Sequence, residues 1–127
     1  MKEYEFIEID FILGLLKPNA KKIFNEIILA KKNKMWATII VFSLTILDNI
    51  YNDEEYLEVV DSLDINKNKI SKDIVWLRKK RNQILHYDTL DKNNSNNILI
   101  DHDLKINSEK AYNILIKNLI KLFPKQM

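Results

Sequence analysis

The most apolar run of the chain is residues 39–47, which read IIVFSLTIL. Together with Met35 and Trp36, these side chains go most of the way around a helix over residues 34–51. A helix that is apolar on nearly all sides is buried against several neighbours. The run is also far shorter than the ~20 residues that a membrane span needs. We therefore predict that residues 34–51 form a central core helix or a dimer interface, with no membrane contact.

Helical spacing of apolar residues continues on both sides of this run. A first apolar segment covers residues 3–16, and Pro18 can begin the next helix at its first turn. Further helices are predicted at residues 20–32, 53–63, about 70–86 and, capped by Ser108, up to the last apolar residues before Pro124. Polar composition predicts a connection at residues 64–69 and a loop at 88–97, with a short extended piece at 98–100.

Composition limits the fold class and the compartment. The 127 residues suit one domain, residues 1–127, and 46% of them are hydrophobic. One Gly and two Pro argue against the many tight turns of a β-sandwich. We expect an all-α, up-and-down bundle of about five helices. Acidic residues stand where a signal peptide would be basic and the chain has no Cys, so we expect a soluble, cytoplasmic protein.

Residues 81–86 read RNQILH and end the helix predicted at about 70–86. One stripe of that helix consists of Ile70, Ile74, Leu77, Arg81 and Ile84. Arg81 is its only polar member, so we expect its guanidinium to be partly desolvated and to need an anionic partner. Asp48 and a phosphate are the two candidates. The alternative is that Arg81 lies at the helix edge and its stem reaches solvent.

Arg81 and His86 together suit metal-free cleavage of RNA. Five positions along a helix separate them by about 140° of rotation and about 7.5 Å of rise, so one helix alone offers a loose pair. Two such helices across a symmetric dimer can bring two Arg and two His into one cleft. His86 can move the proton of the ribose 2′-OH or of the leaving oxygen, Arg81 can stabilise the phosphate, and Asn82 can orient either. The alternative for His86 is a helix C-cap.

The basic run before the motif is a candidate nucleic-acid surface. Arg78, Lys79 and Lys80 point around much of the helix, and some of them must face outward, where they can attract a phosphate backbone. The aromatic rings of Trp76 and Tyr87 can stack on bases, although for Trp76 alone a place in the core is the preferred interpretation. The net charge of +2 is too small to indicate a nucleic-acid partner by itself.

Metal and cofactor sites are not expected. His102 stands between Asp101 and Asp103, and we interpret this group as a solvated turn in a loop rather than a metal site. Lys117, Lys121 and Lys125 recur every fourth residue and are most simply the exposed face of the last helix.

The chain resembles the HEPN superfamily (higher eukaryotes and prokaryotes nucleotide-binding domains). The resemblance rests on Arg81, Asn82 and His86, which match the R-N-x3-H form of that family's R-x4-H motif, and on its place near the end of a long helix in a small helical protein. It implies a homodimer with both motifs at the interface and metal-independent endoribonuclease activity. Arg81 and His86 would be catalytic, Asn82 would assist, and Asp48 would be the acidic residue on an earlier helix.

The resemblance further implies a toxin with a cognate antitoxin protein, or a phage-defence effector. One toxin branch has Tyr two residues after the His, as a target for inactivating nucleotidylation; here Asp88 stands at that position and Tyr87 is one residue early. Other members bind nucleotides, RNA or proteins without catalysis. Two further hypotheses therefore stay open: a non-catalytic binding module, and a structural bundle in which the Arg and His occur by chance.

Overall fold

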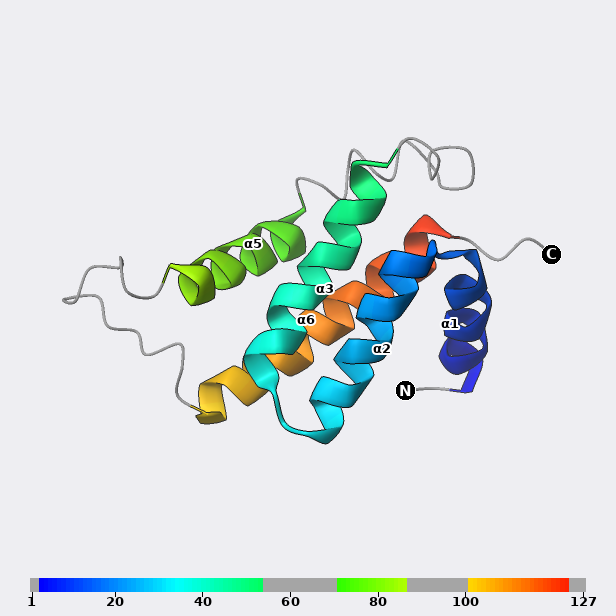
Figure 1. The fold of residues 1–127 in the computed structure, drawn as a ribbon. Coiled ribbons are helices and arrows are strands. Elements are labelled where there is room, and N and C mark those ends of the chain that lie inside the picture. Colours follow the sequence, from blue (N-terminus) through cyan, green and yellow to red (C-terminus); the bar gives the residue numbers. More distant parts are fainter. Residues whose placement is uncertain (1–2, 54–70, 87–100, 124–127) are drawn as a thin grey trace.

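The computed structural model describes residues 3–53, 71–86 and 101–123. Their secondary structure consists of five helices, so this part of the chain is all-α, as predicted. The helices are α1 (Glu3–Leu15), α2 (Pro18–Lys32), α3 (Trp36–Tyr51), α5 (Lys72–Leu85) and α6 (Asp101–Leu122). Successive helices in this series run in opposite directions, which gives an up-and-down bundle (Figure 1).

Helix α3 lies at the centre of the bundle. Its most extensive contact is with α6, and α2 and α5 pack along its other sides (Figure 1). Helix α1 packs on α6. The residues of α3 that are fully removed from solvent include Ile40, Leu44 and Leu47. The prediction of a central core helix over residues 34–51 is therefore confirmed, with bounds two residues shorter at the start.

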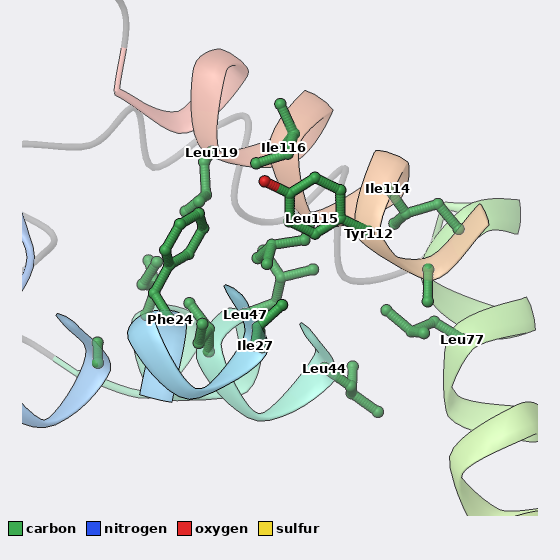
Figure 2. Close-up of a cluster of buried hydrophobic side chains, with 14 of the residues drawn as sticks. Phe24, Ile27, Leu44, Leu47, Leu77, Tyr112, Ile114, Leu115, Ile116 and Leu119 are labelled. Atoms are coloured by element: carbon green, nitrogen blue, oxygen red, sulfur yellow. The ribbon is translucent and has the colours of Figure 1, made fainter. Parts of the chain in front are cut away.

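The main core contains side chains from all five helices. Leu77 of α5 is completely buried, as are Leu115 and Leu119 of α6, and they lie in the same cluster as Phe24 of α2 (Figure 2). Burying apolar surface of this kind is the dominant favourable term in folding. Helix α5 is thus fixed to the bundle by Leu77 and Ile74, and this anchorage determines which of its other side chains face α3, α6 or solvent.

The ends of α2 and α5 follow from their local sequence. Pro18 occupies the first turn of α2, as predicted, and the helix ends at Lys32 with Asn33 as its C-cap. Lys34 has a positive φ of 56°, and the Met35 N–H donates to the Ala30 carbonyl at 2.8 Å, which turns the chain into α3. At the start of α5 the Ser71 hydroxyl accepts from the Ile74 N–H, so Ser71 is the N-cap.

The predicted start of the last helix is wrong. Helix α6 begins at Asp101, seven residues before Ser108, and Ser108 lies inside it with its hydroxyl donating to the Lys105 carbonyl at 2.7 Å. Leu104 is buried at 7% exposure, and packing of this first turn extends the helix through a polar stretch. The helix predicted at residues 53–63 lies, except for Asp53, outside the described residues. The connection predicted at 64–69, the loop at 88–97 and the extended piece at 98–100 also lie outside them.

Candidate functional site

Asp48 and two arginines form a salt-bridge network between α3 and α5. The Arg78 guanidinium donates from Nη2 to Asp48 Oδ1 at 2.7 Å and from Nη1 to Asp48 Oδ2 at 3.2 Å. Arg81 donates from Nη1 to the same Oδ2 at 3.2 Å. Asp48 lies in the last turns of α3, and the two arginines are one turn apart on α5. The expected contact between Arg81 and Asp48 is therefore present.

The two arginines are held unequally. Arg78 makes a bidentate pair with the carboxylate, which is the stronger and more directional arrangement. Arg81 makes one bond to Asp48, and its Nη2 donates to Asn82 Oδ1 at 3.4 Å, the long limit of a hydrogen bond. The buried Nε of Arg81 has no hydrogen-bond partner among the described residues. The Arg81 side chain is 26% exposed, in agreement with the predicted partial desolvation.

Tyr51 belongs to the surroundings of this network, and no motif in the sequence indicated it. It follows Asp48 by three residues on α3 and is 4% exposed. Burial raises the pKa of its hydroxyl, the Arg78 charge lowers it, and the Asp48 charge raises it. Within the described ranges no group accepts from or donates to that hydroxyl. The three-residue spacing from Asp48 was the signal that could have identified Tyr51.

His86 occupies the C-cap of α5, and its side chain is exposed. Its backbone N–H donates to the Asn82 carbonyl at 2.9 Å. Asn82 is exposed as well, so the motif passes from a half-buried Arg81 to an exposed end within about one turn. Tyr87 lies outside the described residues. We predict that Arg81 and His86 lie in one cleft near the two-fold axis of a homodimer. This stays a prediction, because it involves a second chain.

On the side of α5 that faces α6, two lysines lie near the indole ring of Trp76. The Nζ of Lys110, from α6, lies 4.3 Å from the centre of the Trp76 ring, and the Nζ of Lys80 lies 5.8 Å from it. Burial lowers the pKa of Lys80, the charges of Lys79 and Lys110 lower it further, and Asp103 raises it. Trp76 packs against the main core, in agreement with the preferred interpretation. Nothing in the sequence signalled Lys110, because its approach to Trp76 depends on how α5 and α6 pack.

The outward side of α5 is partly apolar. Val75 is 56% exposed and Leu85 58% exposed, and they lie on the side of the helix that also carries Lys79, Asn82 and His86. Single exposed apolar side chains occur on most proteins, so these two do not by themselves indicate an interface.

The Asp-His-Asp group adopts a different structure from the predicted loop. Asp101, His102 and Asp103 form the first turn of α6, and the side chains of His102 and Asp103 are exposed. The described part of the chain contains no cluster of three or more acidic, His or Cys side chains that could hold a metal ion. The side chains of Lys117 and Lys121 are exposed on α6, as predicted.

A pocket of about 380 Å³ lies away from the motif, between α6 and the junction of α2 with α3. Its lining includes Lys31, Trp36 and Tyr112, and the Lys31 Nζ lies 3.7 Å from the centre of the Tyr112 ring. Burial lowers the pKa of Lys31, and the Glu109 charge acts in the opposite direction. No residue of the network around Asp48 lines this pocket.

Comparison of the chain with protein-family models, with curated proteins and with solved structures found no match. Among the described helices, none combines the length and the apolar character needed to cross a membrane.

Proposed function

We propose that the protein is a metal-independent endoribonuclease of the HEPN type. The observation that carries this proposal is the state of Arg81. Its guanidinium is half-buried and makes one bond to Asp48 and one long contact with Asn82, its Nε has no partner among the described residues, and the exposed His86 follows at the end of the same helix. An arginine with unused donors beside a histidine provides an anion-binding group and a proton-transfer group at one end of α5.

The proposed reaction is transesterification at a ribose 2′-OH. A base removes the 2′-proton, the 2′-oxygen attacks the adjacent phosphorus, and the bond from phosphorus to the 5′-oxygen breaks as an acid protonates that oxygen. The products are a 2′,3′-cyclic phosphate and a 5′-hydroxyl. His86 exchanges the proton, since an imidazole can both accept and donate one. Arg81 binds the phosphate oxygens and stabilises the charge of the transition state, and Asn82 orients the phosphate or the imidazole.

A homodimer would complete the site. The rotation of about 140° between Arg81 and His86 along one helix separates their side chains. Apposition of two α5 helices would bring the Arg81 of one chain toward the His86 of the other. The exposed Val75 and Leu85 provide apolar contact area on the side of α5 that such a dimer would bury. In this arrangement Lys79 and Lys80, with Tyr87, would bind the RNA that enters the cleft, while Arg78 stays paired with Asp48.

The biological role proposed for this activity is that of a toxin, or of a phage-defence effector, restrained by a cognate antitoxin protein. Support for this role comes from the resemblance of the RNQILH motif to HEPN ribonucleases. Expression without an antitoxin should slow bacterial growth, and His86→Ala should restore it. Equal growth of the two strains at equal protein levels would argue against a toxin.

Purified protein with total RNA and tRNA in EDTA tests the enzymatic proposal. We expect wild type to cleave, and His86→Ala and Arg81→Ala to lose about 10²-fold or more of the rate, because each removes a group that acts in the transition state. His102→Ala is the matched control, since His102 is exposed and lies on another helix. Binding of RNA by wild type without cleavage would favour the binding-module alternative, and equal cleavage by wild type and His86→Ala would contradict the proposed site.

A further inference from the structure

Among the described residues, the network between α3 and α5 contains more cation than anion. Two guanidinium groups share the single carboxylate of Asp48, which leaves one net positive charge in a half-buried place. Arg78 takes both carboxylate oxygens, whereas Arg81 shares Oδ2 through one bond of 3.2 Å. A carboxylate that is already bound bidentately has less capacity for a second guanidinium.

We propose that Arg78 is a positioning residue: by occupying both oxygens of Asp48, it keeps Arg81 exchangeable, so that Arg81 can leave the carboxylate for an RNA phosphate. The proposal rests on the proposed function for the identity of the anion. Arg81 itself would contact the phosphate, and Arg78 would act on the reaction only through Asp48.

The geometry explains why Arg78 decides the state of Arg81. Both arginines reach Asp48 from the same helix, one turn apart, so loss of the Arg78 fork would leave both carboxylate oxygens to Arg81. A bidentate pair is more stable than the single bond that Arg81 makes now. Arg81 would then be locked onto Asp48, and an RNA phosphate would have to compete with a fully available carboxylate.

A phosphate bound by Arg81 would also neutralise the net positive charge of the network. With Arg78 retained on Asp48, the remaining positive charge is that of Arg81, and a phosphodiester carries one negative charge. Among the described residues, the Nη2 of Arg81 has only its long contact with Asn82 to give up. The exchange therefore breaks two weak bonds and leaves the bidentate pair intact.

Four variants in a His86→Ala background test this role by RNA binding, measured as fluorescence anisotropy of a single-stranded RNA oligonucleotide. Arg78→Met should weaken binding about tenfold, because Asp48 recaptures Arg81. Adding Asp48→Asn to Arg78→Met should restore most of the affinity, since a neutral amide cannot hold Arg81 as a carboxylate does. Arg78→Lys should fall between wild type and Arg78→Met, because it keeps the charge but not the fork.

The double variant Arg78→Met with Asp73→Asn is the control for net charge. Asp73 lies in the first turn of α5. Both double variants lose one positive and one negative charge and so have the same net charge, but only the variant with Asp73→Asn keeps the Asp48 carboxylate. We expect no recovery of RNA affinity from it. Equal recovery in the two double variants would show that only net charge matters and would overturn the role of Arg78, as would a double variant with Asp48→Asn that binds no better than Arg78→Met alone.

Failure of this inference can be distinguished from failure of the proposed function. The binding measurements need no cleavage, because His86→Ala is present throughout. Recovery in the Asp48→Asn double variant without cleavage by the wild-type protein would support the exchange at Arg81 and contradict the ribonuclease. Cleavage by wild type with no effect of Arg78→Met on binding or on KM would support the ribonuclease and contradict the role of Arg78. Circular dichroism confirms that each variant is folded before it is compared.

Discussion

The two flanks of α5 hold their cations in different ways. Toward α3, Arg78 and Arg81 are fixed by directional hydrogen bonds to one carboxylate, at 2.7 to 3.2 Å. Toward α6, Lys80 and Lys110 lie near the ring of Trp76, at 5.8 and 4.3 Å from its centre. The first arrangement defines where each guanidinium group points, whereas the second restricts only how far each amine lies from the ring.

The difference separates two tasks that a basic helix can perform. A planar guanidinium held by one directional bond, as that of Arg81 is, can exchange its carboxylate for one phosphate at a defined position. Amines over an aromatic ring keep their rotational freedom and attract a phosphate backbone without selecting a position on it. In the function proposed for this protein, the flank facing α3 is therefore the reactive one, and the flank facing α6 holds the RNA strand.

The largest expected effect comes from detaching the helix that carries both flanks. Leu77 is completely buried in the main core, so Leu77→Ala should lower the free energy of unfolding by about 2–5 kcal/mol. Ile106→Ala, an apolar truncation at an exposed position of α6, should change it by less than about 0.5 kcal/mol. Urea denaturation of the three proteins measures both values. A small effect of Leu77→Ala would mean that the core does not fix α5 and that neither flank has a defined geometry.

A smaller effect is expected on the flank facing α6. Lys80→Ala with Lys110→Ala should weaken RNA binding, because each amine that binds a phosphate also displaces counterions from the RNA. The slope of log affinity against log salt should fall by about one for each phosphate that the two amines neutralise. Lys117→Ala with Lys121→Ala removes the same charge from an exposed face of α6 and is the matched control. Filter binding at several salt concentrations gives the slopes.

An equal weakening of RNA binding by the two lysine pairs would indicate that only net charge matters. It would contradict the proposal that the side of α5 facing α6 holds the RNA strand. We also expect the Lys80 and Lys110 pair to reduce cleavage only through KM, since neither amine is proposed to contact the reacting atoms.

The smallest effect concerns Tyr51, beside the network. Its hydroxyl is buried and makes no hydrogen bond within the described structure, so Tyr51→Phe should change the free energy of unfolding by less than about 1 kcal/mol at neutral pH. Its pKa is raised above the ordinary value of 10.0, chiefly by burial. Stability from this group is therefore present at lower pH and is lost as the pH rises above 10, where the unfolded chain ionises first.

Urea denaturation at a series of alkaline pH values tests this assignment. The Phe variant should lose less stability than wild type between about pH 9 and 11, because only wild type must keep the Tyr51 proton in the folded state. Tyr112→Phe offers a comparison at a second tyrosine whose pKa burial raises. Identical alkaline destabilisation of wild type and Tyr51→Phe would contradict the buried position of the hydroxyl beside Arg78.

Local pattern predicted most of the fold, and long-range packing accounts for what it missed. The apolar run at residues 39–47 identified α3 as the central helix, and Pro18 marked the start of α2, because these signals act within a few residues. The position of Arg81 on an apolar stripe predicted its partial burial. The start of α6 was missed because its first turn is polar in sequence and is held by the burial of Leu104.

The sequence predicted which residues belong to the candidate site but not which of them contact one another across the helices. Asp48 was identified as a partner of Arg81, yet its bidentate pair with Arg78 depends on how α3 and α5 dock, 30 residues apart in sequence. A run of four basic residues gives no indication of which members face a carboxylate and which face solvent. Lys110 approaches Trp76 for the same reason, through the packing of α6 on α5.

The most direct test is to identify the ends that the protein leaves on a single RNA in EDTA, beside the same RNA with a 2′-deoxy nucleotide at the cleaved position. Attack by the 2′-oxygen at a metal-free site of Arg81 and His86 predicts a 2′,3′-cyclic phosphate and a 5′-hydroxyl from the first RNA and no cleavage of the second. Products with a 3′-hydroxyl and a 5′-phosphate, or cleavage of the deoxy substrate at the same position, would contradict it.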